Sequence, residues 1–299
     1  MSKFTQLRRF VLAVPSVWLA LFFLIPFAIV ARISVSRPVV AQPPYEPLFS
    51  LSEGWAPFLA QLQALSFDSY AIIFDDPIYL AAFLSSLRLA TLSTLLTLLV
   101  AFPLAHAMTR TPRHWRMALV MLAIAPFWTS FLIRIYAWIM ILKDEGLLNG
   151  ALMALGLIDK PLSIFATENA VLIGIVYSYL PFMILPIYHA LDRQDPALLE
   201  AAADLGATPV GAFWRITVPL ALPGIFAGML LVFIPAMGEF VIPDLLGGSD
   251  TLMIGRSIWS EFFENRDWPA ASAIAIVLLA ALVLPLMLHE RQQMKGAGR

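Results

Sequence analysis

The stretch that decides the fold reads Glu200-Ala201-Ala202-Ala203-Asp204-Leu205-Gly206-Ala207 and continues through Phe213, Ile216, Pro219 and Pro223. It is short and mostly polar, and it lies between two long apolar segments. The polar stretch is therefore expected to be a loop between membrane spans. It also carries the start and stop signals of helices, which an unstructured connection would not need.

These signals come in two sets. Asp195 can cap a helix that begins at Pro196, and Gly206 can end that helix in a left-handed conformation. Thr208 and Pro209 then repeat the start signal for a second short helix. A membrane protein that builds two capped helices around a glycine in a loop is expected to present them to a partner.

The second helix also has an apolar side. Val210, Phe213 and Trp214 are spaced i, i+3, i+4, so they fall on one face and form an apolar knob. An alternative is a connector helix that lies at the lipid headgroups. That alternative needs no glycine between two helices and favours a basic polar face, so the partner-binding interpretation is preferred.

The spacing E-A-A-x-x-x-G-A, followed by an aromatic residue and I-x-x-P-x-x-x-P, resembles the cytoplasmic coupling loop of ABC importer permeases. In that family the loop occupies a groove on the ATPase subunit. The resemblance implies a coupling role for residues that match this pattern or form its apolar knob. They are Glu200, Ala201, Ala202, Gly206, Ala207, Phe213, Trp214, Ile216 and Pro219.

Composition supports a membrane protein. Of the 299 residues 60% are hydrophobic and 13% are charged, and the mean hydropathy is +0.83, which is far from ordinary soluble domains. The net charge of −1 argues against a nucleic-acid partner. The chain has no cysteine, and its four histidines lack metal-ligand spacing, so we expect no metal site and no catalytic residue.

Apolar segments long enough to cross a bilayer, about 20 residues each, can be placed about six times. They lie near 11–33, 83–108, 116–142, 169–190, 219–246 and 270–289. The first is longer than the core of a signal peptide, so we interpret it as an uncleaved helix. The sequence therefore predicts an all-α polytopic membrane protein with a single transmembrane domain over residues 1–299, which the resemblance implies is a permease domain.

Orientation follows from Lys and Arg in the short loops. These residues are more numerous on the side of the N-terminus, which predicts that both termini are cytoplasmic. The 191–218 loop then faces the cytoplasm and the 34–82 loop lies outside. Acidic residues of the outer loop outnumber its single Arg37, and they are Glu46, Glu53, Asp68, Asp75 and Asp76. This loop could be a docking surface for a soluble partner, an antechamber for cations, or simply solvated.

The fifth span contains unusual residues for a membrane helix. Gly224 and Gly228 form a G-x-x-x-G step that permits close packing against a second permease subunit or within the chain. The run from Pro235 to Pro243 predicts a broken helix, which is tolerated at a cavity or against protein. Glu239 lies in this run, and an intramembrane carboxylate indicates a functional site or a paired charge.

Three roles for Glu239 remain open at this stage: contact with a cationic substrate, an ion pair with Arg134 or Arg88, or exposure at the interface. Asp244 is closer to the outer rim and could be solvated. Aromatic faces attract ammonium groups, so the candidate substrate path also includes Trp128, Tyr136 and Tyr177. Packing, or anchoring at the membrane interface, is the alternative for these rings.

Further segments are similar to the polyamine branch of ABC importer permeases, and most like its putrescine importers. They are residues 128–134, 136–138, 181–188, 233–243, 246–248 and 261–269. The resemblance implies a type I importer in the bacterial inner membrane. Its partners would be a second homologous permease, an ATPase dimer that uses ATP and Mg²⁺, a periplasmic polyamine-binding protein and membrane lipid.

The chain has no G-x-x-x-x-G-K-[ST] phosphate loop. ATP hydrolysis would therefore belong to a separate chain, and this chain would carry no cofactor and no enzyme activity. The leading hypothesis is a permease subunit that forms half of the path for a putrescine- or spermidine-like cation. The alternatives are a permease for another small solute and a secondary transporter that uses Glu239 as an ion or proton site.

Overall fold

The computed structural model describes all residues except 1, 49–58, 60, 62, 250 and 298–299, so Glu53 lies outside the described residues. The described chain is mainly helical, and it divides into two compact units. One consists of residues 1–80 with 257–299, and the other consists of residues 81–256.

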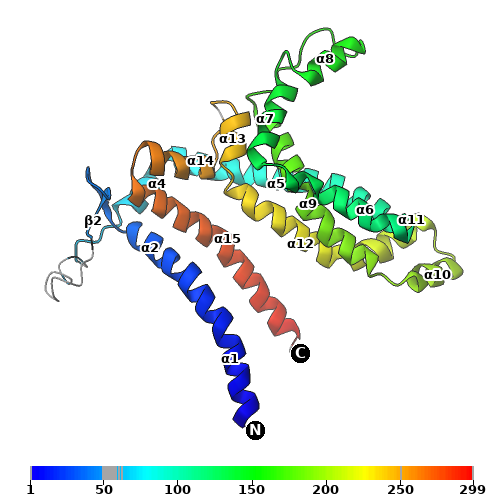
Figure 1. Cartoon of the computed structure of the whole chain (residues 1–299), viewed down its shortest axis with the longest axis horizontal. Helices are drawn as coiled ribbons and strands as arrows, with labels where there is room; N and C mark the ends of the chain where they lie inside the picture. The colour runs from blue at the N-terminus through cyan, green and yellow to red at the C-terminus, as the bar shows by residue number, and fades with distance from the viewer. Residues whose placement is uncertain (1, 49–58, 60, 62, 250, 298–299) are drawn as a thin grey trace. The chain divides into compact units, whose positions relative to one another are not determined.

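The first unit contains the two ends of the chain (Figure 1). Its elements are α1 (Ser2–Leu19), the π-helical η1 (Ala20–Leu24), α2 (Ile25–Ile33), β1 (Arg37–Pro38), β2 (Tyr45–Glu46), α4 (Asp68–Asp75), the π-helical η5 (Ser260–Glu264) and α15 (Trp268–Ala297). The strands pair antiparallel with Arg37 opposite Glu46. Helix α15 packs against both α2 and α4.

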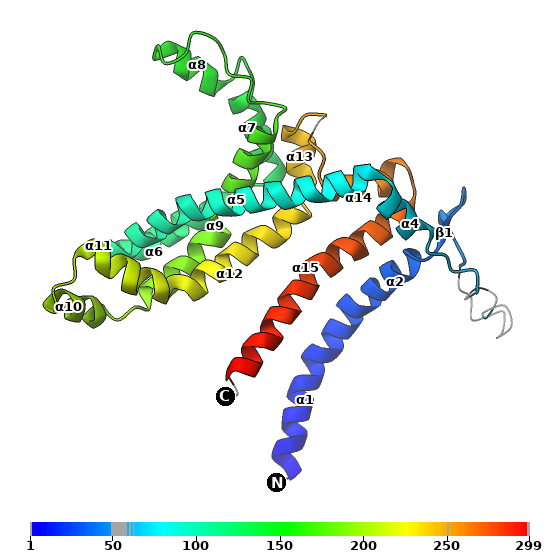
Figure 2. The same cartoon turned by 180° about the vertical axis from the view of Figure 1, so that it is seen from behind.

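The second unit is built around long helices that Figure 2 shows from behind. Its elements are α6 (Arg113–Ile124), the 3-10 helix η3 (Ala125–Trp128), α7 (Phe131–Leu142), α8 (Leu147–Ala154), α9 (Glu168–Asp192), α10 (Pro196–Asp204), α11 (Pro209–Ala212), the π-helical η4 (Phe213–Thr217), α12 (Val218–Met237) and α13 (Val241–Leu246). Two helices run across the boundary between the units, α5 (Pro77–Arg110) and α14 (Ile254–Trp259).

Five helices of the described chain are long and apolar enough to cross a membrane, or six spans if one bent pair is counted. They are Val11–Ile33, Pro77–Arg110, Glu168–Asp192, Pro209–Met237 and Trp268–Pro285, and the bent pair is Arg113–Trp128 with Phe131–Ala154. These agree with the number of spans predicted from sequence and with most of their positions. The expected 34–82 loop is shorter, because α4 and the first turns of α5 lie within it.

The third predicted span, 116–142, is not one straight helix. It bends by 89° because η3 ends at Trp128 and the next two residues leave helical geometry, with ψ of 150° at Thr129 and 136° at Ser130. Pro126 stands in η3, and the hydroxyl of Thr129 donates to its carbonyl at 2.8 Å. Proline, followed by a hydroxyl that bonds the backbone, is a recognised cause of such breaks.

The G-x-x-x-G step packs within the chain, which decides between the two partners considered for it. A Cβ on Gly224 would lie 2.5 Å from the carbonyl oxygen of Pro186 in α9, and a Cβ on Gly228 would lie 2.8 Å from the sulfur of Met183. Helices α9 and α12 therefore approach too closely for a larger residue at either position. They share a buried core with the C-terminal half of α5, including Ala101.

Candidate functional site

The 200–207 stretch forms a helix with a cap at each end, as predicted. Oδ1 of Asp195 accepts a hydrogen bond from the amide of Ala197 at 3.0 Å, and Pro196 is the first helical residue of α10. Gly206 has φ of +80°, which a residue with a Cβ adopts at a cost. The amides of Gly206 and Ala207 both donate, at 2.9 Å, to carbonyls of the last turn of α10. This arrangement is a Schellman motif.

The prediction that a second short helix stands as a separate element is wrong. Thr208 caps it as expected, since its hydroxyl accepts from the amide of Gly211 at 3.1 Å. However, α11 continues through η4 into α12, so it is the first part of the fifth span. Pro219 is the second residue of α12, two positions after the end of the π-helical turn. Its ring cannot donate and would crowd the carbonyl four residues earlier, and the wider turn accommodates it.

The three residues of the predicted apolar knob do not share one environment. Phe213 turns inward and lies edge-on to Phe102 and His106 of α5, at centroid distances of 5.8 and 5.6 Å. Val210 and Trp214 remain exposed, at 68% and 63%. The expectation that these three side chains share one surface is therefore wrong, because Phe213 packs against α5 and the other two do not.

The other coupling candidates lie on α10, just after its end, in η4 and at the start of α12. Glu200, Ala201, Gly206, Ala207 and Pro219 are exposed, and Ala202 and Ile216 are half-buried. No residue of α10 is buried, and Leu205 at its end is 88% exposed. Helix α10 is therefore fixed by its caps and its connections, and its surface is available for a partner.

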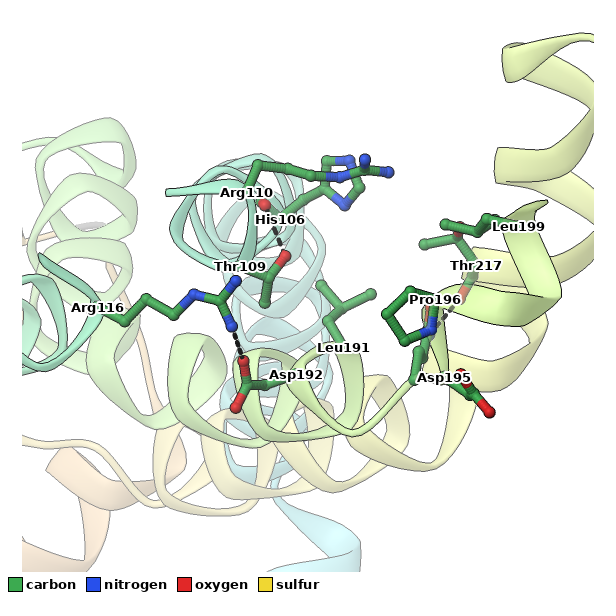
Figure 3. A pocket seen from close by; sticks show the side chains of 11 residues that line it. His106, Thr109, Arg110, Arg116, Leu191, Asp192, Asp195, Pro196, Leu199 and Thr217 are labelled. Atoms are coloured by element: carbon green, nitrogen blue, oxygen red, sulfur yellow. Dashed lines mark hydrogen bonds and ion pairs between the residues drawn. The ribbon is translucent and has the colours of Figure 1, made fainter. Parts of the chain in front are cut away.

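A cavity of about 240 Å³ separates part of α10 from α5 (Figure 3). His106 and Arg110 of α5 line one side, and Asp195, Pro196 and Leu199 line the other. Arg116 and Asp192 also line it and form an ion pair at 2.6 Å.

A second cavity, of about 220 Å³, is lined by Arg110, Leu199 and Phe213 among others. Nearby, the side-chain amide of Gln194 donates to the carbonyl of Thr217 at 3.0 Å. This bond ties the end of α9 to the turn that begins α12. The bond therefore connects the residues on either side of α10 and α11.

The other candidate region is the break in the fifth span, which the sequence predicted. Helix α12 ends at Met237 and α13 begins at Val241. Glu239 lies between them and is 7% exposed. Its Oε1 accepts from the amides of Phe240, Val241 and Ile242 at 3.1–3.3 Å. The carboxylate therefore holds the first turn of α13.

The remaining oxygen, Oε2 of Glu239, accepts from the hydroxyl of Tyr179 at 2.5 Å. Neither arginine considered as its partner forms an ion pair with it among the described residues. Arg88 pairs with Glu168. Arg134 stacks over the rings of Phe127 and Phe131 at 5.6 Å, and its Nε and Nη1 are buried without a hydrogen bond.

Sequence reasoning did not select Tyr179. It chose Tyr177 instead, which lies two residues away and so points to a different side of α9. Tyr177 packs edge-on to Trp138 at 5.3 Å and lines an apolar cavity of about 260 Å³ between α5, α6 and α9. The short spacing between the two tyrosines was the available signal, but only the fold shows which one reaches Glu239.

The other path candidates lie apart from this carboxylate. Trp128 stands at the bend of the third span and is 78% exposed, and Tyr136 on α7 is 55% exposed. Asp244 on α13 forms an ion pair with Arg256 at 3.4 Å. Within the described chain no hydrogen bond, ion pair or ring contact joins Trp128, Tyr136 or Tyr177 to Glu239.

Comparison with known proteins identifies relatives over most of the chain. Residues 7–289 match the family model described as "Binding-protein-dependent transport system inner membrane component". The spermidine/putrescine transport system permease protein PotB of Salmonella typhimurium (strain SL1344) is 45% identical over 75% of this chain and 78% of its own. PotB of Haemophilus influenzae is 38% identical over 96% of this chain and 94% of its own.

A solved structure has a similar fold. A bacterial ABC transporter involved in import of the acidic polysaccharide alginate superposes with a TM-score of 0.70 over 96% of both chains, at 17% identity. A bacterial alginate ABC transporter in complex with an alginate pentasaccharide-bound periplasmic protein also superposes, with a TM-score of 0.70 and 16% identity. At this level of identity the likeness concerns the fold alone.

Proposed function

Because the chain belongs to the family of inner membrane components of binding-protein-dependent transport systems, we propose that it forms half of the path for a polyamine in an ATP-driven importer. It is an inner-membrane permease with several membrane-spanning helices. The observation that carries the polyamine assignment is 38% identity to a spermidine/putrescine permease over 96% of the chain. Preference for putrescine over spermidine is part of the proposal.

The coupling surface is α10 with the exposed start of the fifth span. An ATPase subunit would bind Glu200, Leu205 and Trp214, which the structure leaves exposed. Both termini would be cytoplasmic, so this surface would meet an enzyme that uses ATP and Mg²⁺. The caps at Asp195 and Gly206 keep α10 formed although it buries no side chain, and this favours a surface that acts by contact with a partner.

The substrate path would pass the break at Glu239. Its Oε1 is occupied by three amides, so an ammonium group can reach this carboxylate only at Oε2, where Tyr179 now donates. Exchange of the phenol for the ammonium is therefore the step by which a cation would bind. Trp128, Tyr136 and Tyr177 would offer ring faces along the path, and Asp244 would attract the cation near the outer rim.

The assembly would contain a second homologous permease, two ATPase subunits and a periplasmic polyamine-binding protein. The test is expression of the chain with these partners in cells that lack polyamine import, followed by uptake of labelled putrescine and spermidine. We expect uptake that depends on ATP, together with co-purification of an ATPase.

Each alternative predicts a different outcome of this test. Uptake that collapses with the proton gradient but not with ATP would identify a secondary transporter with Glu239 as its ion or proton site. ATP-dependent uptake of another solute, with no polyamine uptake, would keep the importer and change its cargo.

A further inference from the structure

The segment from Glu261 to Pro269 matches the polyamine permeases but has no part in the path or the coupling surface. In the structure it forms one wall of a cavity of about 500 Å³ within the first unit. The other wall is the turn between β1 and β2. The lining residues are Ala41, Gln42, Pro43, Pro44, Phe262, Phe263, Arg266 and Trp268.

Most of this lining is apolar and held in place by ring contacts. Phe262 and Trp268 stack with their centroids 4.8 Å apart and their planes 5° apart. Phe263 lies edge-on to Phe262 at 4.8 Å and is 56% exposed. Tyr45 supports Trp268 from the hairpin at 6.0 Å. Exposed rings in a fixed arrangement around a hollow are typical of binding surfaces.

The carboxylates of the segment are bonded within the unit. Glu261 accepts from the hydroxyl of Tyr79 at 2.9 Å and from the amide of Asn265 at 3.0 Å. Glu264 accepts from the hydroxyl of Ser260. Asp267 accepts from the backbone amide of Ala270 at 2.8 Å, which caps the start of α15. These acids shape the segment instead of facing the cavity.

Arg266 differs from them in both backbone and side chain. Its φ is +56°, a conformation that few residues other than glycine adopt. Its side chain lines the cavity and is exposed. Within the described residues no hydrogen bond or ion pair engages its guanidinium group. The cavity thus combines an apolar lining with one available cation.

We propose that this cavity binds a loop of the periplasmic substrate-binding protein, and that the loop carries an aromatic or aliphatic side chain beside a carboxylate. The apolar side chain would enter between Pro43 and Phe263, and the carboxylate would pair with Arg266. A polyamine itself does not suit the cavity, because Arg266 would repel it. The proposal rests on the proposed function, because cytoplasmic termini would place this segment on the periplasmic side of the membrane.

The test uses the assembled transporter in lipid nanodiscs with its binding protein. The measurement is the binding-protein concentration that gives half-maximal stimulation of ATP hydrolysis. Arg266→Asn and Arg266→Asp remove or reverse the charge with residues that tolerate positive φ. Phe263→Ser removes part of the apolar wall. Lys160→Asp is the matched control, because it makes the same charge change in another predicted outer loop.

We expect Arg266→Asn to raise the half-maximal concentration about fivefold and Arg266→Asp more than about tenfold, since both lose a charge pair at an interface. Phe263→Ser should raise it about fivefold, as expected for an apolar contact in an interface. Lys160→Asp should stay within about twofold, because an unpaired surface charge acts weakly. Added salt should weaken stimulation of the unmodified transporter more than that of Arg266→Asn.

Equal shifts for Arg266→Asp and Lys160→Asp would overturn this inference alone. Loss of the second permease from the Arg266→Asp complex would also overturn it and would assign the cavity to contact between permeases. Failure of the unmodified chain to co-purify with any ATPase would overturn the proposed function and this inference with it.

Discussion

The hydroxyl of Tyr179 donates to Oε2 of Glu239 across 2.5 Å, and this bond joins α9 to the break between α12 and α13. The other carboxylate oxygen accepts from the first amides of α13. Both oxygens of the buried acid are thus engaged, so the acid shapes the break in the chain described here. A substrate that binds Glu239 must compete with the phenol.

The first prediction concerns this bond. Tyr179→Phe should lower the stability of the purified transporter by about 1.5–3 kcal/mol, because it removes a hydrogen bond to a charged group in a buried place. Thermal unfolding in detergent measures the loss. Tyr177→Phe is the control, since its hydroxyl has no hydrogen bond in the described chain, and it should unfold as the unmodified protein does. Equal unfolding temperatures for the two variants would contradict the role of Tyr179.

The second prediction concerns the charge of Glu239. Glu239→Gln keeps an oxygen for the amides of α13 but loses the negative charge, so the complex should assemble. The concentration of putrescine that gives half-maximal uptake should rise about tenfold, equivalent to about 1.4 kcal/mol.

Asp244→Asn tests, in the same uptake assay, the acidic residue proposed to lie near the outer end of the substrate path. It should have a smaller effect, because Asp244 is exposed and already paired with Arg256. If Glu239→Gln fails to assemble and Arg134→Gln restores assembly, an ion pair absent from the structure must form during the cycle, and the substrate role would be wrong.

The third prediction concerns the end of α10. Gly206 has φ of +80° and open space around its Cβ position, so only the backbone conformation restricts the residue. Gly206→Val should cost about 1–2 kcal/mol in local stability, whereas Gly206→Asn should cost much less. Valine should therefore fray α10 and reduce ATPase co-purification, while asparagine should retain most of it. Identical behaviour of the two would show that the cap does not shape the docking surface.

The fourth prediction distinguishes the role of Trp214 in binding a partner from the role of Phe213 in packing. Trp214→Ala removes an exposed ring, so the fold should be almost unaffected while coupled ATP hydrolysis falls. Phe213→Ala removes a ring that packs on Phe102 and His106 and should destabilise the chain by about 1–3 kcal/mol, less than for a fully buried ring. Thermal unfolding and coupled hydrolysis, measured on both variants, check this. A Trp214 variant with normal coupling would remove that residue from the proposed surface.

Local signals explain which features the sequence predicted well. Asp195, Gly206 and Thr208 act on the residues next to them, so their caps were predictable without the fold. The break between Pro235 and Pro243 also follows from local backbone chemistry. The inward position of Phe213 and the bond from Tyr179 to Glu239 have no such local signal. The first depends on packing of the fifth span against α5, and the second joins residues 60 positions apart.

The last prediction tests whether the close contact between α9 and α12 is needed to carry motion from the proposed coupling surface. Gly224→Ala places a methyl group 2.5 Å from the carbonyl oxygen of Pro186 and 2.6 Å from the Cβ of Ala190. The helices must separate, which should cost about 1–3 kcal/mol as overpacking and weaken coupling of hydrolysis to uptake. Gly150→Ala is the control, because its Cβ meets no atom within 4 Å, and helix propensity predicts a gain of up to about 1 kcal/mol. A stable, fully coupled Gly224→Ala transporter would show that the close approach is not required for transmission.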